Sequence, residues 1–230
     1  MQQTLYALLM ILLTVTCFFI MAKLYARLAY SFLIPVLTST FLIIVILVAF
    51  HVPYESYMEG GKWINSLLGP AVVALAFPLY KQRAFLRKHL FLIAGNVAIA
   101  GLVGMTSVAL FSKWFHLSHS LSLSILPKSV TTPVAMAVAD GLGGSASMAI
   151  VGVMIAGIFG AMLAPFIFRL FGVESSVGRG IALGSASHAL GTSKAAEYNE
   201  LAFSMGSVSM TLNAILSSLL GPVIALLLFS

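Results

Sequence analysis

Two runs of hydroxyl, glycine and cationic residues interrupt sequence that is otherwise apolar. One covers residues 128–133 (KSVTTP) and the other residues 184–192 (GSASHALGT). At membrane depth such side chains are tolerated only where they face protein or water. Together they could line a polar pocket inside a helical bundle. The chemistry they favour is the binding of a small solute.

The first run predicts an anion site at the start of a half-helix. Proline is pre-organised for a first helical turn and threonine is a common cap, so Thr131 and Thr132 should precede a helix that starts at Pro133. Its free N–H groups and its positive dipole end would lie near the bilayer centre. Lys128 adds a charge about one turn upstream, and Ser129 adds a hydroxyl. The plainer alternative is a proline kink whose hydroxyls satisfy freed carbonyl groups.

The second run offers donors and acceptors within eight residues. Ser185, Ser187, His188 and Thr192 carry them, and Gly191 allows close approach of the backbone. His188 could contact a substrate, or it could carry a proton because imidazole titrates near neutral pH. It could also be a structural residue that makes an internal hydrogen bond.

A third break, at Gly69 and Pro70 with Asn65 one turn earlier, predicts a second half-helix start. Opposed half-helix starts are a recurring architecture for transporter sites, although a plain kink would give the same sequence. The predicted substrate-binding residues are Asn65, Gly69, Pro70, Lys128, Ser129, Thr131, Thr132, Pro133, Ser185, Ser187, His188, Gly191 and Thr192.

The composition places these residues in a polytopic membrane protein. Of 230 residues, 60% are hydrophobic and only 8% are charged, with a mean hydropathy of +1.08. Soluble domains carry roughly 25% charged residues. We found no metal-ligand spacing, no nucleotide-binding loop and no nucleophile motif. The sequence therefore predicts neither an enzyme nor a cofactor, a metal site or a nucleic-acid partner.

The predicted fold is an all-α transmembrane bundle in one domain, residues 1–230. It should have seven or eight spans, two of them broken or re-entrant, since a span needs about 20 apolar residues. The motif SLLGP occurs at residues 66–70 and again at 218–222, which is consistent with an inverted repeat, although chance similarity in a chain rich in Leu and Gly would give the same match. The apolar segments are residues 4–22, 32–50, 63–80, 90–112, 113–126, 129–139, 148–168, 177–189 and 201–229.

The basic residues predict the orientation in the membrane. Lys23 and Arg27 follow the first span, and four more basic residues lie within residues 81–88. Cytoplasmic loops carry the excess of Lys and Arg, so the N-terminus should lie outside a bacterial cytoplasmic (inner) membrane.

Residues 67–80 (LLGPAVVALAFPLY), 126–133 (LPKSVTTP) and 186–192 (ASHALGT) resemble the LrgB/CidB family, in order and across nearly the whole chain. The chain looks most similar to the Gram-negative inner-membrane members. The resemblance implies antiholin-like or holin-like proteins that modulate murein hydrolase activity and cell lysis. It also implies a small LrgA/CidA-like membrane partner, absent from this chain. A chloroplast relative exchanges glycolate and glycerate, and some bacterial pairs import pyruvate.

Two functional hypotheses follow. The first is a secondary transporter of small monocarboxylates, working as a homodimer, with one bundle moving against another as an elevator. The second is a lysis modulator without a transported solute. A channel is a third option.

Overall fold

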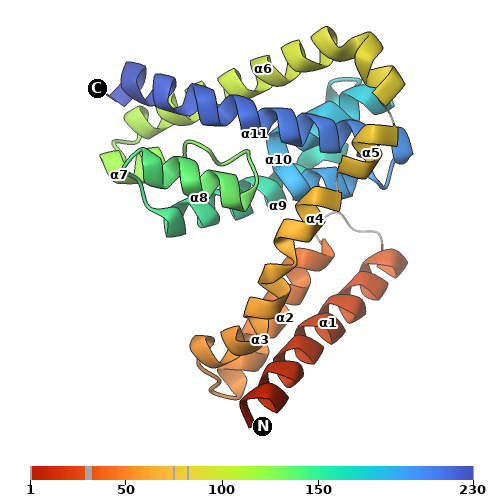
Figure 1. Cartoon of the computed structure of the whole chain (residues 1–230), viewed down its shortest axis with the longest axis vertical. Coiled ribbons are helices and arrows are strands. Elements are labelled where there is room, and N and C mark those ends of the chain that lie inside the picture. The colour runs from red at the N-terminus through yellow and green to blue at the C-terminus, as the bar shows by residue number, and fades with distance from the viewer. Residues whose placement is uncertain (1, 29–32, 75, 82, 230) are drawn as a thin grey trace. The chain divides into compact units, whose positions relative to one another are not determined.

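The computed structural model describes residues 2–28, 33–74, 76–81 and 83–229, and within these ranges every regular element is a helix (Figure 1). The all-α prediction is confirmed for this part of the chain. The helices form two compact units, Met1–Leu75 and Ala76–Ser230. The expectation of one membrane domain stays a prediction.

The first unit is held together by α1, which packs against both α2 and α3 (Figure 1). The closest approach is at Gly60 of α3, where an added Cβ would lie 2.6 Å from the carbonyl oxygen of Ala7. Thr14 and Tyr57 join the same two helices through a 3.0 Å hydrogen bond between their hydroxyls. The helices of this unit are α1 (Gln2–Leu28), α2 (Pro35–Ala49), α3 (Tyr54–Ser66) and α4 (Leu68–Ala74).

The predicted apolar segment at residues 63–80 is divided among short helices. α3 ends at Ser66, Leu67 caps it, and α4 begins at the next residue. Gly69 and Pro70 therefore lie in the first turn of a new helix, as the sequence indicates, but α4 has only seven residues.

The second unit contains the long helices of the C-terminal part. α11 packs against α6 and α10 (Figure 1). Ile93 and Val97 of α6 pack against Met205 and Val208 of α11. The helices are α5 (Ala76–Lys81), α6 (Arg83–Trp114), α7 (His119–Ile125), α8 (Thr132–Gly141), α9 (Ala146–Leu170), α10 (Ser176–Ala195) and α11 (Glu200–Phe229).

Four helices among the described residues are long and apolar enough to cross a membrane: α1, α6, α9 and α11. This supports a multi-pass membrane protein, but it is fewer than the seven or eight spans predicted. The difference arises because α2 has 15 residues and the other apolar segments are divided into shorter or broken helices. About 20 helical residues are needed to cross the hydrocarbon core.

Small residues bring the helices of the second unit close together, as is usual where lipid surrounds the bundle. An added Cβ at Gly184 of α10 would overlap the carbonyl oxygen of Gly206 in α11. On α9, an added Cβ at Gly152 would lie 3.3 Å from the Ile125 side chain, and one at Gly160 would overlap the Ser187 hydroxyl. Gly152 of α9 therefore faces α7, and Gly160 faces α10.

Gly184→Ala should destabilise the protein by about 1–3 kcal/mol, since the backbone of α11 must move to admit the methyl group. Gly95→Ala in α6 is the matched control, because nothing lies within 4 Å of its added Cβ. Thermal unfolding of both purified variants in detergent measures the difference. Equal melting temperatures would contradict the packing described for α10 and α11.

Candidate functional site

The chain leaves helical geometry in the middle of α10. Ser187 has φ −130° and ψ 17°, and His188 has φ 44° and ψ −132°, a region that non-glycine residues rarely occupy. After this break the chain turns back along itself: an added Cβ at Gly191 would overlap the carbonyl oxygen of Leu183. Asn199, just after α10, donates a 2.7 Å hydrogen bond to Ser176 at its start. The break therefore forms the tip of a helical hairpin.

Two glycines of α9 make room for this tip. Added Cβ atoms at Gly157 and Gly160 would meet the His188 ring and the Ser187 hydroxyl. His188 Nε2 donates a 3.0 Å hydrogen bond to the carbonyl of Val153, which fixes the ring, and no described residue is hydrogen-bonded to Nδ1. Thr192 closes the turn by donating to the His188 carbonyl. These contacts stabilise a backbone conformation that is otherwise unfavourable.

The loop between α7 and α8 carries the second set of polar groups. Its buried Leu126 and Val130 anchor it, and α8 begins at Thr132 with Thr131 at the N-cap. The predicted helix is present, but it starts at Thr132, one residue before the predicted Pro133, and the Thr131 side chain makes no capping hydrogen bond, contrary to expectation. The hydroxyls of Thr131 and Thr132 have no hydrogen-bond partner among the described residues.

Asn213 of α11 ties the two sets together. It is fully buried, and its Nδ2 donates to the carbonyl of Ser129 at 3.3 Å and to that of Ser185 at 2.9 Å. Its Oδ1 is buried without a partner, close to Gly101 of α6. One amide thus holds the loop before α8 against the break in α10.

The charge at this cluster is positive and uncompensated. Lys128 is half-buried and its Nζ donates a 3.1 Å hydrogen bond to the Ser129 hydroxyl, while no described carboxylate pairs with it. Lys128 lies close enough to His188 for the two side chains to interact electrostatically. The cluster combines one ammonium group, several hydroxyls and an imidazole, which suits an anionic ligand better than a cation.

Comparison with known proteins identifies the family. The LrgB-like family matches residues 14–227. The chain belongs to the LrgB-like family.

Its relatives cover nearly the whole chain. The uncharacterized protein YxaC of Bacillus subtilis is 58% identical, with 97% of each chain covered. The holin-like protein CidB of Staphylococcus aureus is 37% identical with the same coverage, and that of Staphylococcus epidermidis is 35% identical with full coverage of both chains. No solved structure matches. None of these relatives comes from a Gram-negative bacterium, so the expected similarity to such members stays a prediction.

In this LrgB-like protein the structure brings together most of the predicted residues of the second unit. Asn213 bonds to Ser129, whose hydroxyl accepts from Lys128, and to the helix turn just before Ser187 and His188, while Thr131 and Thr132 follow Ser129 on the same loop. Gly191 and Thr192 shape the tip of the hairpin through their backbone contacts.

Five other predicted residues have different surroundings. The Ser185 hydroxyl donates to the Ile181 carbonyl of its own helix, so the contribution of Ser185 to the junction is its backbone carbonyl. Pro133 is exposed and lines an apolar groove of about 570 Å³ between α8 and α11. Gly69 and Pro70, like Asn65, are exposed in the first unit, and their part in the site stays a prediction.

Asn213 is the residue of the junction that was not predicted from the sequence. Residues 201–229 were predicted only as one long uncharged span. The signal is a stripe at helical spacing, consisting of Gly206, Ser209, Asn213, Ser217 and Gly221, all of which are buried. Such a face is typical of a helix that packs against other helices.

Asn213→Ala should lower stability by about 1–3 kcal/mol, because two buried carbonyl groups lose their donor. The matched control is Asn96→Ala in α6, where the exposed amide bonds only to Leu92 of its own helix. We expect this control to change stability by less than about 0.5 kcal/mol. Thermal unfolding in detergent measures both, and an unchanged Asn213→Ala variant would rule out the junction.

Proposed function

We propose that this protein is a secondary transporter of small monocarboxylates such as pyruvate, glycolate or glycerate. The observation that carries the proposal is the unpaired ammonium group of Lys128, next to the start of α8 and tied through Asn213 to the break in α10.

The depth of the junction supports a site within the membrane. Gly101 and Asn213 lie near the middle of the candidate spans in α6 and α11, and Gly157 lies near the middle of α9. All three contact the junction. Charged groups at such a depth are costly and usually serve ion or substrate pathways.

We infer that residues 119–141 and 176–198 are two re-entrant hairpins. α7, α8 and each half of α10 have about ten residues or fewer, or about 15 Å of helix, roughly half of the 30 Å hydrocarbon core. The first hairpin starts beside the C-terminal end of α6, and the second starts after the C-terminal end of α9. The two hairpins therefore enter the second unit from its opposite ends, and their tips meet between these ends, as in transporters built from inverted repeats.

The donors at the tips suit a carboxylate with an adjacent oxo or hydroxyl group. Lys128 supplies a positive charge, and Thr131 and Thr132 supply hydroxyl groups. The free backbone N–H groups of the first turn of α8 point out of the N-terminal end of this helix and can also donate to an anion. The free Ser187 hydroxyl and the imidazole of His188 would then meet the second oxygen function. His188 could also carry a proton. The proposal involves no catalytic step.

The charge distribution supports an orientation for the second unit. One end of this unit is formed by α5, the start of α6 and both ends of the second hairpin. This end contains seven basic residues, Lys81, Arg83, Arg87, Lys88, Arg169, Arg179 and Lys194. The opposite end contains Lys113 as its basic residue among those described. By the positive-inside rule the first end is cytoplasmic, consistent with an outside N-terminus in a bacterial cytoplasmic membrane.

A second candidate function is modulation of murein hydrolase activity and lysis, because the Staphylococcus relatives are named holin-like. A homodimer that moves as an elevator belongs to the first proposal. A small LrgA/CidA-like membrane partner is compatible with both.

Lys128→Ala should reduce uptake of labelled pyruvate or glycolate into proteoliposomes by at least about tenfold, since a hydrogen bond to a charged group contributes about 1.5–3 kcal/mol. Lys113→Ala, an exposed lysine at the end of α6, is the matched control and should keep wild-type uptake. Both variants must show the same melting temperature as the wild type.

Saturable wild-type uptake that is stimulated by unlabelled substrate inside the vesicles would identify a carrier and exclude a channel. Equal uptake by both lysine variants would reject the assignment of Lys128. A lytic phenotype that persists in Lys128→Ala, with no saturable uptake in the wild type, would favour the second function.

A further inference from the structure

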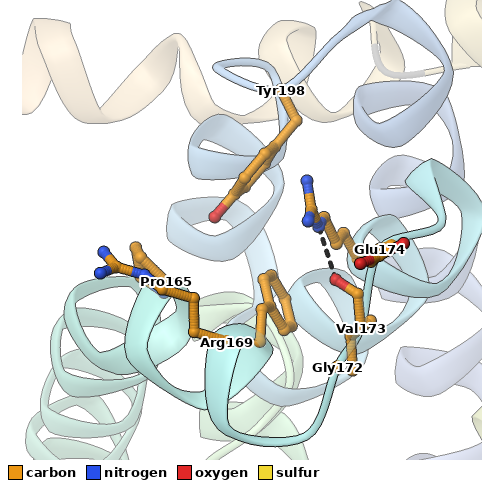
Figure 2. Close-up of a pocket in the computed structure, with 8 residues that line it drawn as sticks. Pro165, Arg169, Gly172, Val173, Glu174 and Tyr198 are labelled. Carbon is orange, nitrogen blue, oxygen red and sulfur yellow. Dashed lines mark hydrogen bonds between the residues drawn. The ribbon is translucent and has the colours of Figure 1, made fainter.

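The junction of α9 and α10 contains a pocket of about 350 Å³ that lies apart from the hairpin tips (Figure 2). Its lining comes from the last turns of α9, the connecting turn and the first turn of α10, with Tyr198 from the segment after α10. In the proposed orientation this end of the second unit lies at the cytoplasmic membrane surface.

The connecting turn has the geometry of a helix cap. Gly172 has φ 64°, which glycine adopts without strain, and Val173 N donates a 2.8 Å hydrogen bond to the Phe168 carbonyl. This pattern is a glycine-based helix C-cap. It places the carbonyl of Val173 at the pocket wall (Figure 2).

Arg179 is held by this wall. Its Nε donates a 2.8 Å hydrogen bond to the Val173 carbonyl, and its guanidinium lies over the ring of Tyr198 at 4.8 Å and that of Phe168 at 6.0 Å. The two rings pack edge to face at 6.0 Å. An arginine fixed in this way loses little freedom when it binds a ligand.

The remaining guanidinium N–H groups of Arg179 have no acceptor among the described residues. Glu174 lines the same pocket, but no ion pair joins it to Arg179 within 4.0 Å. Arg169 adds a second positive charge to the lining. A planar guanidinium with free donors matches the oxygens of a phosphate group.

We propose that this pocket binds a phosphate group, with Arg179 as its main ligand. The phosphate could belong to the headgroup of an anionic phospholipid or be free in solution. Basic pockets between membrane helices on the cytoplasmic side bind such headgroups. The volume of the pocket exceeds what inorganic phosphate alone needs and is within the range of small-ligand sites.

The test uses purified full-length protein with two probes. Native mass spectrometry measures retention of added phosphatidylglycerol, and thermal unfolding measures stabilisation by inorganic phosphate. Arg179→Gln should weaken binding of the true ligand about tenfold. The matched control is Arg83→Gln, because Arg83 also lies over a tyrosine ring, at 4.2 Å from Tyr80, and donates to a backbone carbonyl at the same end of the unit.

Glu174→Gln separates ligand binding from a structural role of Arg179. It leaves Arg179 in place and removes the opposing carboxylate, so binding should become a few-fold tighter. Arg179-dependent retention of phosphatidylglycerol would identify a lipid site, and Arg179-dependent stabilisation by phosphate alone would identify a soluble anion. No binding of either probe, or equal loss in Arg83→Gln, would overturn the proposal, as would an unchanged affinity in Glu174→Gln.

Discussion

The second unit of this LrgB-like protein depends on one requirement, that backbone groups freed by broken helices find partners away from water. Asn213 meets it for two chain segments at once, through the carbonyls of Ser129 and Ser185. A buried carbonyl without a donor is costly, so a single side chain has a large effect on how the two segments lie together. This amide joins the two backbone segments that carry Lys128, Ser187 and His188.

Close packing around glycine makes the same arrangement possible. α9 receives the tip of the α10 hairpin at Gly157 and Gly160, and α11 receives its first half at Gly206 opposite Gly184. Larger side chains at these positions would keep the hairpin away from its neighbours. The polar site therefore depends on the small-residue packing, because the packing brings the backbone segments close enough for the short side chain of Asn213 to bond to both.

Much of this site could be predicted from the sequence, because polar runs inside apolar segments are conspicuous. Residues 128–133 predicted a helix start at Pro133, one residue from the observed start at Thr132, and residues 184–192 contain the break in α10. Three features were not predicted. Asn213 is a single amide in a long apolar span, the return of the chain after His188 depends on contacts with Ser176 and Leu183, and the division of the apolar segments left four long spans among the described residues. Each of these three features depends on contacts between residues far apart in the sequence, and local sequence patterns contain little information about such contacts.

The meeting of the two hairpin tips is the central claim, and cross-linking tests it most directly. In a Cys17→Ser background, Ser129→Cys and Ser185→Cys would be combined and treated in native membranes with a short bifunctional thiol reagent. The account predicts efficient cross-linking of this pair and none when Ser129→Cys is combined with Ser175→Cys at the far end of the second hairpin. Failure of the first pair to cross-link, with both cysteines reactive towards a monofunctional reagent, would contradict it.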